Sequence, residues 1–144
     1  MEWNESFNTG IEIIDEQHQS LISHFNKLQS SITKGDASQE IGNILKFLVD
    51  YTKFHFKSEE KLMTIIKYPD LTTQKKDHQE FVNKIVNYLM KLKEGRAINT
   101  FNMMHFLINW ITKHIMKEDR KIGEFIRDNN ILVPSDKTQF KEMD

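Results

Sequence analysis

The sequence predicts an all-α fold, an antiparallel up-down-up-down four-helix bundle with an N-terminal arm and a short C-terminal tail. Apolar residues recur at alternating spacings of three and four over four long segments, which is the spacing of one helix face. Only two prolines, Pro69 and Pro134, interrupt the chain, and short connections join the four segments. The 144 residues fall within the usual size of one domain, so we expect a single domain over residues 1–144.

The first two helices are expected at residues 15–34 and 38–66. Asp15 can act as the N-cap of the first helix, and Gly35 marks its end. The second helix must stop before Pro69, because the residue that precedes a proline disfavours helical backbone. Both segments therefore have recognisable ends.

The third and fourth helices are expected at residues 71–94 and 99–127. The third follows the turn "KYPD" and is closed by Gly95, in the place that a C-terminal glycine prefers. The fourth has a broader apolar face. The tail "DNNILVPSDKTQFKEMD" is polar and contains a proline, so we expect it to lie loosely on the surface or to fray.

Composition excludes several classes of function. With 20 basic and 21 acidic residues and no long block of like charge, neither a nucleic acid nor a membrane surface is an expected partner. The chain has no cysteine, so nitrogen and oxygen atoms must hold any metal. No stretch resembles a signal peptide or approaches the roughly 20 apolar residues that span a bilayer. We therefore expect a soluble, cytoplasmic protein.

Polar residues interrupt the apolar face of every helix. They are His18 on the first helix, His55 and Glu59 on the second, Gln74 and His78 on the third, and His114 with nearby Asp119 on the fourth. In an antiparallel bundle, the start of the odd helices and the end of the even helices meet at one end, so these side chains should converge. Burial without partners would cost several kcal/mol for each group, so the cluster must be mutually satisfied or must hold cations.

The chemistry of this cluster favours a metal centre. Imidazole and carboxylate ligands in a bundle core suit first-row metals, and two carboxylates among four histidines suit a dinuclear site better than a single ion. A structural zinc site would normally use four ligands, whereas six candidates are present here. Iron is therefore favoured over zinc.

Four motifs in this order resemble those of the hemerythrins, especially the single-domain bacteriohemerythrins. They are "GIEIIDEQHQSLI", "HFKSEE", "YPDLTTQKKDHQEF" and "WITKHIMKED". The resemblance covers nearly the whole chain and implies a non-haem diiron protein that binds dioxygen reversibly, for transport, storage or delivery, rather than an enzyme. It implies one iron held by His18 and His55 and a second held by His78 and His114. Glu59 and Asp119 would bridge the two irons, an oxygen species would complete the bridge, and the chain would be a monomer or a weak homo-oligomer.

The chain departs from the family pattern at Gln74, where the family has a fifth histidine four residues before His78. Gln74 lies on the same helix face as His78, so its amide could ligate iron weakly, hold a water or do neither. A missing histidine leaves an additional coordination position. A diiron oxidase, a peroxide or nitric oxide reductase, and a sensor or purely structural bundle therefore remain alternatives.

Several neighbours of the proposed ligands have simpler expected roles. We expect Glu16, Glu60 and Glu118 to be solvated flanks, His24 and His105 to lie outside the site, and Trp3 and Trp110 to be packing residues. Apolar side chains are expected to keep the site dry, which would protect bound dioxygen from protonation. The candidates for this pocket wall are Phe25, Phe56, Ile111 and Ile115.

Overall fold

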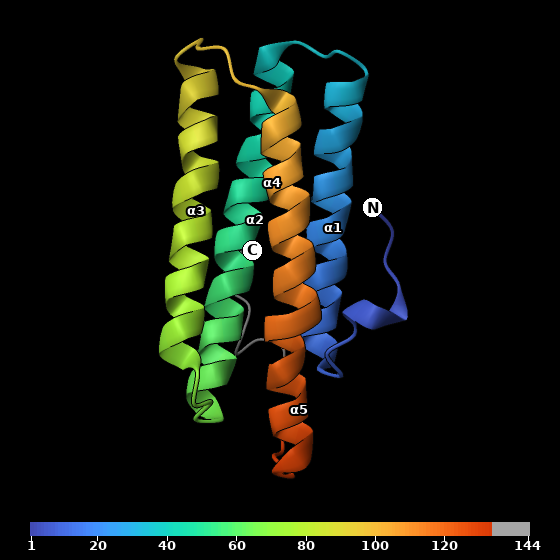
Figure 1. Ribbon diagram of the computed structural model, residues 1–144, viewed down its shortest axis with the longest axis vertical. Coiled ribbons are helices and arrows are strands. Elements are labelled where there is room, and N and C mark those ends of the chain that lie inside the picture. Colours follow the sequence, from blue (N-terminus) through green and yellow to red (C-terminus); the bar gives the residue numbers. More distant parts are fainter. Residues whose placement is uncertain (134–144) are drawn as a thin grey trace.

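The computed structural model describes residues 1–133, and its described elements are all helical. In chain order they are η1 (Glu5–Phe7), α1 (Glu12–Thr33), α2 (Ser38–Ile65), α3 (Leu71–Lys93), α4 (Thr100–Lys113), η2 (His114–Asp119) and α5 (Arg120–Asp128). The segments α4, η2 and α5 follow one another directly and form the fourth helix of the bundle (Figure 1). The predicted all-α four-helix fold is confirmed. None of the described helices has the length and apolar composition needed to cross a bilayer.

Consecutive helices of the bundle run in opposite directions (Figure 1). The connections from α1 to α2 and from α3 to α4 lie at one end, and the turn from α2 to α3 lies at the other, which is also the end at which α1 starts. The N-terminal arm, which includes the short η1 turn, lies beside α1. This arrangement brings the start of α1 and α3 to the same end as the close of α2 and the fourth helix, as the sequence predicts.

Two glycines end helices as predicted. Gly35 and Gly95 follow α1 and α3 with φ angles of 74° and 72°, a left-handed conformation that glycine adopts without steric cost. The residue after each glycine donates its backbone N–H back into the helix, from Asp36 to the Ser31 oxygen at 3.1 Å and from Arg96 to the Lys91 oxygen at 2.9 Å. These bonds satisfy carbonyls that the helix end would otherwise leave open.

The predicted N-cap role of Asp15 is wrong, because α1 begins at Glu12 and Asp15 lies inside its first turn. The Asp15 carboxylate accepts hydrogen bonds from the Thr9 N–H and hydroxyl, both at 2.8 Å, and from the Gly10 N–H at 3.2 Å. These donors belong to the arm, where a φ of 85° at Gly10 turns the chain into the helix. Asp15 therefore fastens the arm to α1.

The fourth helix is not the single regular helix predicted at residues 99–127. Between α4 and α5 the six residues of η2 (His114–Asp119) form a π-helical segment. In a π-turn the backbone bonds run from residue i to i+5, so the helix widens locally and rotates its later residues relative to a regular α-helix. This widening occurs at the two predicted metal ligands of the fourth helix.

Part of the tail packs more firmly than predicted. Ile131 and Val133 are partly buried against an apolar cluster that includes Ile14 and Ile122, whereas Leu132 between them is exposed. The Ile131 N–H also donates to the Ile126 oxygen at 3.0 Å, which holds the chain against α5. The prediction for residues 134–144 lies outside the described residues.

The apolar core is divided into two clusters, and the polar residues lie between them on every helix. The larger cluster includes Leu21, Phe56, Phe81 and Ile115, and the smaller includes Ile14, Leu62 and Ile122, with Leu71 packed against it. His18 lies between Ile14 and Leu21 on α1, and Glu59 lies between Phe56 and Leu62 on α2. A polar layer therefore crosses the bundle, with apolar packing on both sides.

Gly123 on α5 is the point at which the arm packs most closely on the fourth helix. A Cβ atom at this position would lie 1.8 Å from the Thr9 backbone oxygen, whereas a Cβ atom at Gly42 on α2 would meet nothing within 4 Å. We expect Gly123→Ala to lower the free energy of unfolding by about 1–3 kcal/mol, because the arm must move. Gly42→Ala should raise it by up to about 1 kcal/mol through helix propensity. Denaturant unfolding measures both, and equal effects would show that the arm does not pack on Gly123.

Candidate metal centre

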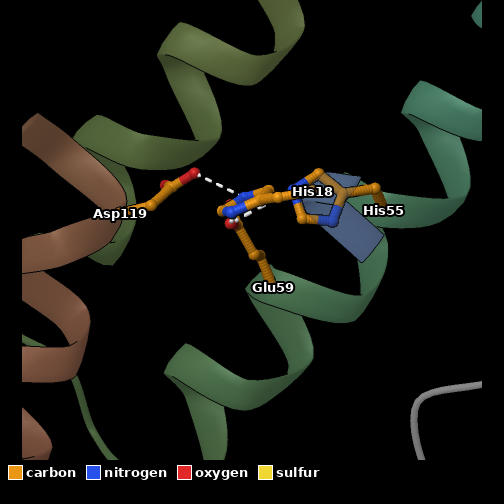
Figure 2. A group of neighbouring side chains, drawn as sticks. All are labelled: His18, His55, Glu59 and Asp119. Atoms are coloured by element: carbon orange, nitrogen blue, oxygen red, sulfur yellow. Dashed lines mark hydrogen bonds and ion pairs between the residues drawn. The ribbon is translucent and has the colours of Figure 1, made fainter. Parts of the chain in front are cut away.

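Four of the predicted ligands form one half of the polar layer (Figure 2). His18 comes from α1, His55 and Glu59 come from α2 one turn apart, and Asp119 comes from the end of η2. The His18 Nε2 atom lies 3.2 Å from Glu59 Oε2 and 3.0 Å from Asp119 Oδ2. The His55 Nε2 atom lies 3.2 Å from the same Glu59 oxygen. Two histidine nitrogens therefore face the two carboxylates.

The other half of the layer repeats this arrangement with the remaining oxygens. The His78 Nε2 atom, from α3, lies 3.3 Å from Glu59 Oε1, and the His114 Nε2 atom lies 3.0 Å from Asp119 Oδ1. The two Nε2 atoms lie 3.0 Å from each other. All four histidines thus direct the same ring nitrogen toward the shared carboxylates.

The six side chains form two groups that have both carboxylates in common. One group contains His18, His55, Glu59 and Asp119, and the other contains Glu59, His78, His114 and Asp119. Within each group one ligand atom of every residue lies within 4.8 Å of the others, and all six residues are buried. Each group has the composition and size of a site for one ion, and the two groups share both carboxylates.

The unsatisfied atoms of the centre fit a metal better than a closed hydrogen-bond network. Glu59 Oε1 and both oxygens of Asp119 are buried and accept no hydrogen bond from the described residues, although a histidine nitrogen lies close to each. Donor atoms on adjacent positions of an octahedral ion with bonds of about 2.1 Å lie about 3.0 Å apart. The 3.0–3.3 Å separations found here match that spacing.

The electrostatics of the centre keep its carboxylates ionised. Burial disfavours the charged form of Glu59, but His55, His18 and His78 outweigh it and hold the pKa of Glu59 well below its usual range. Burial and the Glu59 charge also oppose ionisation of Asp119, yet contacts with His114 and His18 leave its pKa lowered. Both side chains are therefore anionic oxygen ligands at neutral pH.

The histidines respond differently to the same surroundings. Burial lowers the pKa of His18 and of His78, but contacts with carboxylates outweigh it and raise each pKa from 6.5 to about 9. For His55 burial prevails over the attraction of Glu59, so its pKa is lowered. Because metals bind the neutral imidazole, cations that bind here must displace protons from His18 and His78.

Two residues outside the predicted ligand set hold histidine rings in place. Gln17 Oε1 lies 2.8 Å from His55 Nδ1, and Glu60 Oε2 lies 2.8 Å from His78 Nδ1. Each contact turns Nδ1 outward and leaves Nε2 facing the carboxylates, as is usual for histidines that bind metals. The prediction that Glu60 is a solvated flank is wrong, since its carboxylate contacts His78 on α3. Sequence analysis overlooked Gln17, although it follows Ile14 at the spacing of a buried face.

The π-helical segment explains how His114 and Asp119 share one centre. In a regular α-helix, residues five apart point in directions that differ by about 140°. A π-turn brings residues five apart close to the same face. The η2 segment begins at His114 and ends at Asp119, and the two side chains approach to 3.0 Å.

Gln74 is buried on α3 one turn before His78, as predicted, and is only 2% exposed. Neither its amide oxygen nor its amide nitrogen has a hydrogen-bond partner within the described part of the chain. A buried amide without partners costs about 1–3 kcal/mol for each unsatisfied group. Gln74 therefore lies on the same helix face as His78 with polar atoms that the described residues leave unused.

Among the four predicted wall residues, Phe56 borders the centre directly. Its ring stacks on His78 with 3.8 Å between ring centroids, and it also lies 5.8 Å from His55. Phe25, Ile111 and Ile115 are buried in the larger apolar cluster, and their contribution to a pocket wall stays a prediction.

The remaining aromatic and histidine predictions are explained by local packing. Trp110 stacks on His114 at 4.4 Å and on Phe81 at 4.1 Å, so this packing residue also covers a ligand. His24 lies against Tyr51, and exposed His105 contacts Asn109 at 3.0 Å. Neither of these two histidines belongs to the metal-ligand groups.

Comparisons with known proteins identify a family for this chain. The family model described as "Hemerythrin HHE cation binding domain" matches residues 9–126, which include all six converging residues. The chain is 33% identical to the bacteriohemerythrin of Methylococcus capsulatus over 124 residues, covering 85% of this chain and 94% of the relative. It is 31% identical to the bacteriohemerythrin of Clostridium acetobutylicum over 125 residues, covering 83% and 95%.

Solved structures agree with the sequence comparison. A crystal structure of a wild-type hemerythrin superposes with a TM-score of 0.81 at 32% identity, covering 86% of this chain and 95% of the other. The matched family model spans the helices that carry the cluster. The chain therefore belongs to the hemerythrin family and is a cation-binding four-helix bundle.

Proposed function

We propose that this protein holds two iron ions and binds dioxygen reversibly, for transport, storage or local delivery rather than for turnover. The observation that carries the proposal is the convergence of four Nε2 atoms on two shared carboxylates, in two groups of four ligands. His18 and His55 would hold one ion, His78 and His114 the other, and Glu59 and Asp119 would bridge them. Iron would supply the redox chemistry with dioxygen.

The protein residues around the ions would control access and orientation. Phe56, which stacks on His78, and the apolar clusters on both sides of the polar layer exclude bulk water from the centre. Gln17 and Glu60 fix the ring orientation of His55 and His78. A dry, preorganised centre favours reversible binding, because protons that would promote release of reduced oxygen are kept away.

The first test is the metal content of the protein. After anaerobic reconstitution with ferrous iron, we expect elemental analysis to find two irons per chain, and the loaded protein to bind and release dioxygen spectroscopically. Glu59→Ala should lose both irons, because this carboxylate contacts histidines of both groups. Glu118→Ala is the matched control, since Glu118 precedes the other shared carboxylate in sequence but pairs with Lys121 at the surface.

One iron per chain or none would refute the dinuclear site. Full occupancy by zinc after growth in ample iron would refute the choice of iron. Retention of both irons by the Glu59→Ala protein would show that this carboxylate does not bridge.

Metal removal should destabilise the protein, and by an amount that depends on pH. Metal that binds only the folded chain adds its binding free energy to stability. In the chain without metal, the pKa values of His18 and His78 are raised from 6.5 to about 9. Protonation of these two side chains therefore stabilises the folded state, and the stabilisation is present in full below pH 6.5. This contribution is lost as the pH rises through about 9.

We therefore expect the metal-free protein to melt below the loaded protein at every pH in this range, and the gap to widen between pH 6.5 and 9. Glu59 and Asp119 stay ionised throughout, since their pKa values are lowered. Thermal unfolding of both forms at several pH values measures the gap. Equal melting temperatures would mean that the polar layer is satisfied without metal.

Gln74 is the observation that favours a second candidate function. With an amide and not an imidazole at position 74, an ion held by His78 and His114 would have one fewer strong donor and could accept a second exogenous ligand. A diiron oxidase or a peroxide or nitric oxide reductase needs such an opening. Multiple turnovers with peroxide or nitric oxide would favour this candidate over reversible oxygen binding.

The substitution Gln74→His separates the two candidates within one chain. We expect the histidine variant to autoxidise more slowly and to bind fewer exogenous anions such as azide, because the added imidazole fills the opening and retains the ion more firmly. Autoxidation rates and anion titrations under identical conditions measure both effects. An unchanged rate together with unchanged anion binding would show that the Gln74 amide is already an adequate ligand.

A further inference from the structure

The six ligands of the centre are closed off from solvent, since none of them is more than 5% exposed. A cation can therefore enter or leave only when part of the fold opens. Local opening costs least in segments outside long helices, because fewer backbone bonds and packed side chains must be given up. The N-terminal arm (residues 1–11) is such a segment, with the three-residue η1 turn as its only regular element.

The arm runs past the polar layer from one apolar cluster to the other. Phe7 is 4% exposed and belongs to the larger cluster, whereas Ile11 is 5% exposed and belongs to the smaller. Because the polar layer lies between the clusters, residues 8–10 pass beside it. The η1 turn also lies against η2, the segment that carries His114 and Asp119. The arm thus covers the layer at the fourth helix.

Thr9 joins the two helices that border this part of the arm. The Asp15 carboxylate on α1 accepts hydrogen bonds from the N–H and the hydroxyl of Thr9 at 2.8 Å and from the Gly10 N–H at 3.2 Å. On the other side, the Thr9 backbone oxygen packs on α5, where a Cβ atom at Gly123 would lie 1.8 Å from it. The arm therefore spans the seam between α1 and the fourth helix, and one carboxylate fastens it beside the polar layer.

Polar groups of the centre line the seam beneath the arm. His18 on α1 and Asp119 on the fourth helix approach each other there to 3.0 Å (Figure 2). The His18 Nδ1 atom and both Asp119 oxygens have no hydrogen-bond partner among residues 1–133. A cation that leaves water needs polar atoms in exchange, and the apolar clusters on both sides of the layer do not supply them. The arm therefore covers a polar seam that leads to the ligands.

We infer that the arm is a strap over the route by which cations enter and leave the centre, and that Asp15 is its latch. The inference rests on cation binding by the centre and not on dioxygen binding. Asp15 belongs to neither metal-ligand group, so it acts on the opening of the strap and not on the bound ions. A weaker latch should therefore speed entry and release by the same factor and leave the affinity unchanged.

The test measures uptake and release of ferrous iron by the full chain under anaerobic conditions, and of zinc in parallel. In Asp15→Asn the charge is lost, and the new amide nitrogen cannot accept the Gly10 N–H. We expect uptake, and release to an excess of chelator, to become about 10- to 100-fold faster at unchanged affinity, as fits the loss of charge-assisted hydrogen bonds. Gly123→Ala displaces the arm from its other side and should act in the same direction.

Each variant has a matched control at a position away from the arm. Asp36→Asn removes the same charge at the far end of α1, where the carboxylate accepts the Ser31 hydroxyl at 2.7 Å. Gly42→Ala adds a methyl group on α2 where a Cβ atom meets nothing within 4 Å. Both controls should exchange cations at the rates of the unmodified protein.

Amide hydrogen exchange of the metal-free protein tests the opening itself. In the closed arm, the Phe7 and Asn8 N–H groups donate to the Asn4 and Glu5 oxygens at 3.0 and 3.1 Å. Asp15→Asn should speed exchange at these two amides and leave the amides of α2 unchanged. Faster exchange in all helices would mean that the variant unfolds globally, which overturns the latch.

The outcomes separate the strap from the proposed function. If the unmodified protein holds zinc but not iron, the proposed function fails, and the rates with zinc still decide the strap. If it holds neither cation, both fail. A more open arm with unchanged cation rates places the route elsewhere and overturns the inference. Faster release with a weaker affinity assigns Asp15 a role in positioning the ligands and also overturns it.

Discussion

The fold of this protein is organised around two carboxylates buried in the middle of its core. Glu59 and Asp119 are fully buried, and three of their four oxygens accept no hydrogen bond within the described residues. Buried charge on this scale is tolerated only when opposite charge surrounds it. Four imidazoles, one from each helix of the bundle, surround the two carboxylates, and the contacts raise the pKa of His18 and of His78 to about 9, so these two supply positive charge at neutral pH. The requirement explains why a polar layer interrupts the apolar seam of every helix at the same height.

Two segments cover the end of the bundle that lies nearest to the polar layer. The smaller apolar cluster lies between the polar layer and the nearby end of the bundle. The segments at this end must cover its apolar side chains from solvent. The arm is tied to α1 through Asp15, and its Thr9 oxygen occupies the space that a side chain at Gly123 would need. Ile131 and Val133 pack against the same cluster. The arm and the segment after α5 thus help to shield the centre.

Sequence periodicity was sufficient to locate the helices and five of the six converging residues, because a polar residue on an apolar face is conspicuous. Asp119 was included because it lies near His114 and belongs to the motif "WITKHIMKED", which resembles a hemerythrin motif. The outer partners were harder to find. Glu60 lies about 100° around α2 from Glu59, so its position along the sequence indicates a surface residue, and only the neighbouring helix makes it a partner of His78. The π-helical segment between His114 and Asp119 was also not predictable from spacing, since a five-residue interval places two residues on different faces of a regular helix.

The division of the core by a polar layer also connects metal binding to the stability of the bundle. The helices pass from one apolar cluster to the other through the polar layer, where Phe56 and Trp110 stack on His78 and His114 but several carboxylate and amide atoms lack hydrogen bonds from the described residues. The Gln74 amide atoms have no hydrogen-bond partner among residues 1–133, which costs about 1–3 kcal/mol for each unsatisfied group. Cations bound between these atoms would satisfy them, so metal binding and the stability of the folded bundle are expected to be coupled.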